Sequence, residues 1–480
     1  MTSMFTFIKS KKFFQSKVEG RLHPLFLGIN ALLHFGDDPA WRLALSIFLA
    51  ARIVLSAWAF AVSALIPLAV SNLDLHGEPV VTMFDLRTST RAVFSRVLDG
   101  KELHFRAAYP NLMDLETNSL WDTSGRAVSG ERTGAQLSAS KYSAEEVFPY
   151  RGVAPTPNTL LAPWQRFDAN WYLKIAQRGY GDDGSSVYFP LYPFLIRIIG
   201  NLLLGNELLG AILISNLAVV GVLYFFYQMA LELSDASSAK RATAFLMIFP
   251  TAFFLLAPYT ESFFVLCALA SLHEARHARW GRAGVWGACA ALARLQGALL
   301  IVPLAYLAWR EFRRGENAAT FYVLRFTSLL LIPFATLAFF AFTHASLLNA
   351  YESQLHARFV MPWENVGAAI ALIANAHASL IDILNLLVTF FFGAIVILVW
   401  ARLPRELGLY AAMMFLAPLF RMTTEQPLVS MFRYVLVIFP AFILFGRWSA
   451  NAWAQRATVY LSIPLQLFLS AQFFLWGWVA

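Results

Sequence analysis

Charged residues are scarce in this sequence. Asp, Glu, Lys and Arg make up 14% of its 480 residues, against about 25% in ordinary soluble domains. Cysteine is scarcer still, since Cys267 and Cys289 are the two in the chain and both lie in apolar stretches. This shortage of cysteine excludes a disulfide-stabilised secreted scaffold and a cysteine-based zinc site.

Hydrophobic residues take the place of the missing charges. They make up 58% of the chain, with 43 Phe residues, and the mean hydropathy is +0.57. Soluble domains contain about 45–50% apolar residues, and a soluble fold of this length could not bury the excess. The composition therefore excludes a cytosolic globular enzyme and a disordered chain, and predicts an integral, multi-pass membrane protein.

Apolar runs along the chain predict an all-α fold, a polytopic bundle of about eleven transmembrane helices. Residues 1–40 are polar and basic and are expected to form a cytoplasmic N-terminal segment. The first span is expected within 41–70, where Arg52 either snorkels to the interface or separates an interfacial helix from the span. Residues 71–206 then form a large outer region, and residues 207–480 form the rest of the bundle.

The distribution of basic residues predicts the orientation of these spans. With residues 71–206 outside, the short inner connections hold twelve Lys and Arg residues, and the outer connections beyond residue 206 hold four. This excess follows the positive-inside rule and places the C-terminus outside. The short apolar helix expected at 191–204 lies along the interface in this arrangement, because a crossing there would reverse the bias.

The outer region has two parts. Residues 71–165 are rich in polar residues with Gly and Pro breaks, and predict a large, partly irregular loop. The sequence QRFDANWYLKIAQRGY follows, and its apolar residues, Tyr172 among them, recur at helical spacing. This pattern predicts an amphipathic helix that begins near Asp168 and lies on the membrane surface.

Ionisable residues from distant parts of the chain meet at the predicted outer face. The candidates for a functional site are Asp168, Asp182, Asp183, Glu261, Arg294, Arg421 and Arg433. A carboxylate can act as a general base toward an acceptor hydroxyl, and an arginine can bind a phosphate bidentately. This combination of groups predicts a site for an anionic, lipid-borne substrate.

Each candidate also has a purely structural interpretation. Asp168 and Glu261 could each cap the helix that follows, and Asp182 and Asp183 could form a solvated turn. Arg294 could bind backbone carbonyls at the tip of a short hairpin near 294–297. The later arginines, Arg421 and Arg433, could snorkel to the membrane boundary.

Nucleotide-binding motifs are missing from the sequence. It contains no GxxxxGK[ST] and no GxGxxG at a strand-to-helix turn. We expect no cofactor, no nucleic-acid partner and, since nothing in the predicted outer site requires one, no metal. We expect the activated substrate to be embedded in the membrane, and we expect membrane lipids to be partners of the protein.

Five segments, in order along the chain, carry a family resemblance. They are RFDANWYLKIAQRGY with YFPLYPFLIR, then ISNLAVVGVLYFFY, FLMIFPTAFFLLAPYTESFFVL, GRAGVWGACAALARLQGALLIVPLAYL and SMFRYVLVIFPAF. Together they resemble the GPI mannosyltransferase II (PIG-V-like) family of GT-C glycosyltransferases. The resemblance covers about 164–310 and 428–445.

The resemblance implies an activity and roles for several residues. The implied enzyme moves a hexose, with mannose expected, from a polyprenyl-phosphate donor to a hydroxyl of a lipid or glycan acceptor, with inversion. Asp168 matches the family's acidic residue and is the implied base. The other matching positions imply substrate binding, and with the remaining outer candidates they form the set Arg294, Arg433, Glu261, Arg421, Tyr259, Tyr172, Asp182 and Asp183.

The sequence departs from the family pattern at two places, and the second, a longer outer loop, leaves the acceptor open. Phe167 stands where the family usually has Trp, and the loop at 71–163 is longer than usual. A prokaryotic relative in the plasma membrane, with its site facing outward, is expected; a eukaryotic protein would place the site in the ER lumen. The alternatives are a transporter or flippase of a lipid-linked sugar, and a non-catalytic subunit of a glycosylation complex.

Overall fold

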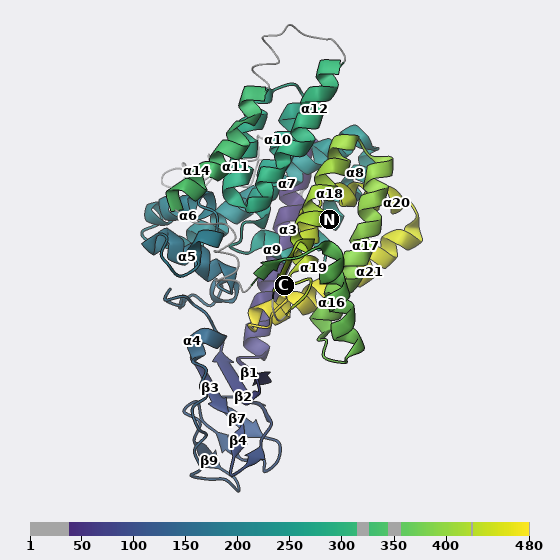
Figure 1. Ribbon diagram of the computed structural model, residues 1–480. Coiled ribbons are helices and arrows are strands. Elements are labelled where there is room, and N and C mark those ends of the chain that lie inside the picture. The colour runs from purple at the N-terminus through teal and green to yellow at the C-terminus, as the bar shows by residue number, and fades with distance from the viewer. Residues whose placement is uncertain (1–37, 314–325, 344–356, 424–425, 480) are drawn as a thin grey trace, which may run out of the picture.

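A bundle of helices makes up most of the molecule, and a smaller region of strands projects from one end of it (Figure 1). The structure, a computed structural model, describes residues 38–313, 326–343, 357–423 and 426–479. The predicted N-terminal segment 1–40 therefore lies almost entirely outside the described residues.

Five helices are long and apolar enough to cross a membrane, by length and composition. They are α3 (Pro39–Leu65), α7 (Glu207–Leu233), the helical stretch Phe326–Thr343 that contains α14 (Leu331–Thr343), α17 (Leu380–Arg402) and α21 (Ala452–Phe474). A sixth is added if Met431–Val437 and Pro440–Trp448, bent by 84°, form one broken span. These helices confirm a helical, integral membrane protein.

The predicted number of about eleven spans is not confirmed. The other apolar runs of the described chain fold as shorter helices: α8 (Ala236–Ile248), α10 (Glu261–Arg276), α11 (Trp280–Ala293), α12 (Ile301–Arg313) and α18 (Arg405–Leu419). The longest of these has 16 residues, or about 24 Å at 1.5 Å per residue, and a hydrocarbon core is about 30 Å thick. The helix expected at 191–204 is α6 (Leu191–Leu202), which is shorter still.

Arg52 lies inside one continuous helix. The side chain of Asp38 accepts a hydrogen bond from the Ala40 amide and caps α3, which then runs unbroken to Leu65. The Arg52 guanidinium lies 4.6 Å from the Trp164 ring centre and donates to the Leu256 carbonyl at 3.4 Å. The protein itself therefore binds the charge of Arg52. The side chain does not snorkel to the interface, and it does not separate an interfacial helix from the span.

The predicted loop at 71–165 contains strands, so the fold is mostly but not entirely α-helical. Three small antiparallel sheets form there: β1 (Leu68–Leu75), β2 (Glu78–Asp85) and β3 (Arg91–Ser95); β4 (Val97–Leu98) and β5 (Lys101–Glu102); and β6 (Phe105–Ala108), β7 (Asn111–Asp114), β8 (Leu120–Trp121) and β9 (Ala127–Ser129). They share a core of their own, in which Val81, Met83 and Trp121 are fully buried. We call this region the β region.

Two tight turns set the register of these strands. Leu75 pairs with Glu78 across His76-Gly77, and Leu98 pairs with Lys101 across Asp99-Gly100. All four central residues have positive φ, as a two-residue type I′ hairpin requires. The two dipeptides were the sequence signal for hairpins in this region. The polar composition of the region, which is typical of a loop, concealed that signal.

An aromatic cluster joins the β region to the end of the bundle. Phe84 from β2 packs with Phe148, Tyr150 and Trp476. Arg166 lies beside this cluster, fully buried, and donates to the carbonyls of Phe474, Ala162 and Gln165. The segment that leads into the predicted motif is thereby fixed to the C-terminal part of the chain.

The described chain also contains shorter helices and strands, some of which line the site described next. They are α4 (Ala144–Val147), α5 (Asp168–Arg178), α9 (Phe253–Leu256), η5 (Leu295–Leu300), β10 (Ala357–Phe359), α16 (Pro362–Ala374), β11 (Arg421–Thr423), α19 (Met431–Tyr434) and α20 (Pro440–Trp448). Strands β10 and β11 pair antiparallel, with Arg358 opposite Met422 and Phe359 opposite Arg421.

Candidate functional site

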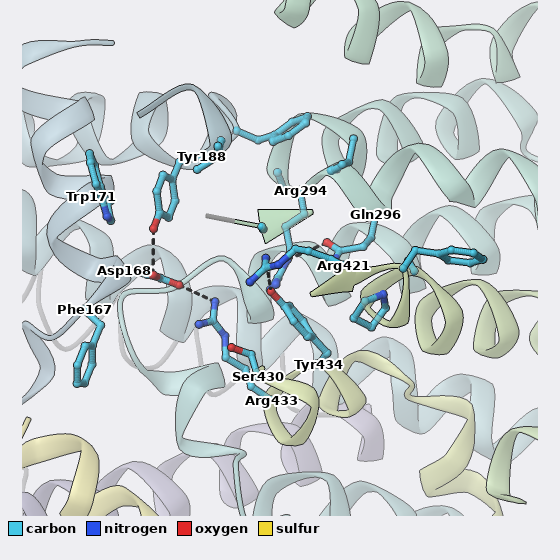
Figure 2. A pocket seen from close by; sticks show the side chains of 18 of the residues that line it. Phe167, Asp168, Trp171, Tyr188, Arg294, Gln296, Arg421, Ser430, Arg433 and Tyr434 are labelled. Atoms are coloured by element: carbon cyan, nitrogen blue, oxygen red, sulfur yellow. Dashed lines mark hydrogen bonds and ion pairs between the residues drawn. The ribbon is translucent and has the colours of Figure 1, made fainter. Parts of the chain in front are cut away.

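A cavity of about 890 Å³ lies where α5, the break between α11 and η5, the β10–β11 pair and α19 meet. Figure 2 shows its side chains converging from these separate elements. Of the predicted site residues, Asp168, Tyr172, Arg294, Arg421 and Arg433 line it. The structure therefore brings together five candidates that the sequence placed only at one membrane face.

Asp168 is held at the edge of the cavity by two partners. It is the first residue of α5, after Phe167 with φ +46°, and the helix has no side-chain cap. Its Oδ2 lies 2.8 Å from Arg433 Nη2, and its Oδ1 accepts a hydrogen bond from the Tyr188 hydroxyl at 3.1 Å. The Asp168 side chain thus faces the cavity and the arginine instead of capping its helix.

Tyr188 is a donor that stays protonated. Burial, together with the nearby charge of Asp168, raises the pKa of Tyr188 well above its ordinary value. Its hydroxyl therefore keeps its proton at physiological pH and donates it to the carboxylate. Tyr188 belongs to the YFPLYP motif, but sequence reasoning did not single it out.

Glu261 connects two arginines behind the cavity wall. It is fully buried, and its Oε1 lies 2.5 Å from Arg433 Nε and 2.6 Å from Arg294 Nη1. Arg433 therefore bridges Asp168 and Glu261 through different nitrogens of one guanidinium. Because Glu261 binds two charges, its carboxylate does more than cap α10, although it is absent from the cavity lining.

The backbone around Arg433 is fixed by polar contacts. Ser430 precedes α19 in the left-handed region, with φ +65°. The Phe432 amide donates to Asn385 Oδ1 at 2.9 Å, and the Phe432 carbonyl accepts from Thr251 Oγ1 at 2.9 Å. This support from α17 and from the turn before α9 preorganises the arginine before any ligand arrives.

Arg294 lies at the predicted break between two short helices. α11 ends at Ala293, and Arg294 is extended, with φ −155° and ψ 149°. A Cβ on Gly297 would approach the Ala290 carbonyl oxygen within 2.1 Å, so the chain needs glycine to fold back here. Arg294 Nε donates to Gln296 Oε1 at 3.3 Å, which aims the guanidinium into the cavity (Figure 2).

Cationic groups dominate the cavity. Among the described residues that line it, five are arginines and one is a carboxylate: Arg151, Arg294, Arg358, Arg421, Arg433 and Asp168. Arg421 donates to the Tyr434 hydroxyl at 3.2 Å, and Arg294 lies 5.5 Å from the centre of the same ring. Sequence reasoning missed Arg151 and Arg358, which lie outside the quoted motifs and carry no local signal.

Besides Glu261, three predicted residues lie away from the cavity lining. Tyr259 is buried, donates to the Arg166 carbonyl at 3.1 Å, and supports the Arg433 guanidinium with its ring at 4.8 Å. Asp183 forms an ion pair with Lys174 and accepts from the Ser185 amide, in the turn that also contains Asp182. The structure thus separates these residues from the ones that face the cavity.

These features define a helical membrane protein with a cationic cavity at one end of its bundle. Residues 148–359 match the model of the mannosyltransferase (PIG-V) family. The match supports the family resemblance found in the motifs, and with it a glycosyltransferase that is similar to the PIG-V mannosyltransferases. The matched range contains Asp168, Glu261, Arg294 and Arg358 and ends before Arg433. No curated protein matches the chain in sequence.

Proposed function

We propose that the protein transfers a hexose, mannose in the first instance, from a polyprenyl-phosphate donor to a hydroxyl of a lipid or glycan acceptor. The reaction takes place at the outer membrane face and inverts the anomeric carbon, with Asp168 as general base. The excess of arginines over carboxylates in the cavity is the observation that carries this proposal. A site of this kind attracts an anion, and the family match supports a sugar as the transferred group.

The rest of the cavity lining suits an isoprenoid. Leu295, Leu299, Phe359, Pro418 and Phe420 contribute apolar surface beside the arginines. A polyprenyl phosphate has the same two parts, a charged phosphate and an apolar tail. A soluble nucleotide sugar would instead leave this apolar surface without a partner, so the lining favours the lipid-linked donor.

The arginines of the cavity differ in how far their charge is balanced, and this suggests different roles. Arg433 and Arg294 share the buried Glu261, so part of their charge is already balanced. Arg421 and Arg358, on β11 and β10, also line the cavity, and Arg421 contacts the same Tyr434 side chain as Arg294. A donor phosphate beside Arg294 and Arg421 would accept hydrogen bonds from both, and the charge on the departing phosphate would be stabilised in the transition state.

Asp168 retains the capacity to accept a proton. Arg433 binds Oδ2 and Tyr188 binds Oδ1, but each carboxylate oxygen has two lone pairs. The acceptor oxygen attacks the anomeric carbon and its proton moves to Asp168. The bond between that carbon and the phosphate oxygen breaks at the same time, and the electron pair leaves with the polyprenyl phosphate. One displacement of this kind inverts the configuration.

Trp171 offers a surface for the sugar ring. Its ring stacks on Tyr188 with centroids 5.3 Å apart, and the Arg151 guanidinium lies 4.5 Å from its centre. Aromatic rings with polar neighbours bind the apolar faces of sugars while the neighbours meet the hydroxyls. Both residues lie on the Asp168 side of the cavity, where the reacting carbon has to be.

The test supplies radiolabelled polyprenyl-phosphate-mannose and a membrane lipid extract to the purified protein in nanodiscs. Asp168→Asn should lower the rate of transfer by about 10²–10⁴-fold, the usual contribution of a general base, while donor binding persists. Asp99→Asn is the matched control, because Asp99 is exposed, lies in a β-region turn with φ +52°, and is replaced by a residue that tolerates that conformation.

Each result of this experiment has a defined meaning. Transfer by the wild type and by Asp99→Asn, but not by Asp168→Asn, supports the enzyme and its base. Full turnover in Asp168→Asn would overturn the assignment of the base. Tight donor binding without transfer in every variant, also with polyprenyl-phosphate-glucose, would favour a transporter or an accessory subunit.

A further inference from the structure

Three potential metal ligands converge between α7 and α10, away from the cavity. Glu232 lies near the end of α7, and His273 and His277 lie one turn apart near the end of α10. One ligand atom of each residue lies within 4.8 Å of the others. His273 is 12 positions after Glu261, which is about 18 Å along a helix, so this cluster is remote from the proposed reaction.

The three side chains lie close together but do not hydrogen-bond to one another. Glu232 Oε1 is 3.8 Å from His273 Nδ1 and 3.7 Å from His277 Nε2, which is longer than a hydrogen bond. His273 Nδ1 is buried and has no hydrogen-bond partner among the described residues. The cluster therefore places three ligand atoms near one another and leaves His273 Nδ1 without a hydrogen bond among the described residues.

The protonation of His277 fits a metal ligand. Its Nδ1 lies 2.8 Å from the His273 carbonyl oxygen, and because a carbonyl can only accept, Nδ1 carries the proton. The lone pair is then on Nε2, the atom that faces Glu232. A backbone carbonyl that orients a ligating imidazole through its other nitrogen is the usual support of a metal site.

We propose that Glu232, His273 and His277 bind a divalent transition-metal ion of the Zn²⁺ type. Zn²⁺ binds imidazole nitrogen and carboxylate oxygen at about 2.0–2.2 Å. In a tetrahedral shell two ligand atoms are therefore about 3.4 Å apart, and the separations of 3.8 and 3.7 Å from Glu232 would have to shorten by a few tenths of an ångström when an ion binds. The second carboxylate oxygen, Oε2, pairs with Arg276 Nη2 at 3.3 Å, so Oε1 is the proposed ligand.

The surroundings leave room for a fourth ligand. Glu232 and His277 line a second cavity, of about 260 Å³, together with Arg276, Arg310 and Glu406. Water in this cavity can complete a tetrahedral coordination shell and gives the ion a path to the site. A bound ion would tie the end of α7 to the end of α10 and stabilise that end of the bundle.

The experiment titrates untagged, chelator-treated protein in detergent with Zn²⁺ by calorimetry, and with Co²⁺ by visible absorption. The wild type should bind one ion at this site, with a rise in apparent unfolding temperature. The double variant His273→Ala/His277→Ala should lose affinity by more than the roughly 10–100-fold that loss of a second-shell partner costs. Glu232→Gln, which keeps the size of a partly exposed side chain, should weaken binding without affecting folding.

His104→Ala is the matched control, because His104 also lies beside carboxylates, 2.9 Å from Glu116 and 3.8 Å from Glu102. It should bind Zn²⁺ like the wild type. Equal affinity in the wild type and in Glu232→Gln and the double variant would overturn the proposal. Failure of the wild type to bind either ion would overturn it as well.

Discussion

Glu261 and Glu406 are two fully buried carboxylates, each bound by two arginines, near opposite ends of the bundle. Glu261 lies 2.6 Å from Arg294 and 2.5 Å from Arg433. Glu406 lies 2.6 Å from Arg276 and 3.0 Å from Arg310. Helix α10 connects the two networks, because Glu261 is its first residue and Arg276 is its last.

The two networks differ in what their arginines reach. Arg433 continues to Asp168 and, with Arg294, lines the large cavity, whereas Arg276 and Arg310 lead to the small one. The side chains of Arg294 and Arg433 are 10% and 8% exposed, against 17% and 32% for Arg276 and Arg310. We therefore expect the Glu261 network, which continues to residues of the large cavity, to affect sugar transfer, and the Glu406 network not to affect it.

Replacing each carboxylate with its amide tests this comparison most severely. Glu261→Gln removes the counter-charge of Arg294 and leaves Arg433 with Asp168 alone, and breaking a buried pair costs about 3–5 kcal/mol. It should also lower transfer by roughly 10²-fold, because Arg433 no longer holds its position. Glu406→Gln should cost less stability, since Arg276 and Arg310 can turn toward water, and should transfer sugar normally per folded molecule.

The measurement is the apparent unfolding temperature in detergent, together with the transfer rate normalised to folded protein. Equal losses of transfer in Glu261→Gln and Glu406→Gln, at matched stability, would show that the two networks do not differ in function.

Replacing an arginine with lysine in each network sharpens the comparison. Arg433 binds Asp168 through Nη2 and Glu261 through Nε, and a single ammonium cannot occupy both positions. Arg433→Lys should therefore lose one charged hydrogen bond, worth about 1.5–3 kcal/mol, and lower transfer about 10–100-fold. Arg310→Lys, the matched change beside Glu406, should leave transfer unchanged; a comparable loss there would contradict the assignment.

Asp114 extends the comparison to a buried carboxylate with neutral partners. Burial alone would raise its pKa, but hydrogen bonds from Trp121, Thr117 and Ser119 outweigh burial and lower the pKa of Asp114 below its ordinary value of 3.8. Its contribution to the stability of the β region is therefore complete above that pH and is lost as the pH falls through the depressed value. Asp114→Asn should lower the free energy of unfolding by about 1–3 kcal/mol at neutral pH. The NH₂ group of the amide would face N–H and O–H donors, with which it cannot form hydrogen bonds.

Hydrogen exchange of the full chain measures this effect in strands β7–β9. Protection should fall in Asp114→Asn and stay unchanged in Asp99→Asn. It should also fall in the wild type under acidic conditions, after correction for the intrinsic exchange rate. Unchanged protection in Asp114→Asn would mean that the neutral hydrogen bonds contribute little.

The sequence by itself determined the class of protein, the family resemblance and the break at Arg294. These follow from local properties: an excess of apolar residues, motifs a few residues long, and a glycine next to a short helix. The sequence also predicted Asp168 and Arg433 as candidates at one face. It missed the β region, because its short strands lie among polar residues whose composition resembles that of a loop.

Only the tertiary structure decided which candidates meet. Arg433 and Glu261 are 172 positions apart, and nothing local to either residue indicates their ion pair. The same holds for Arg358, which reaches the cavity through the pairing of β10 with β11. Electrostatic partners are selected by distance in space, and for groups this far apart along the chain that distance is set by how the helices pack.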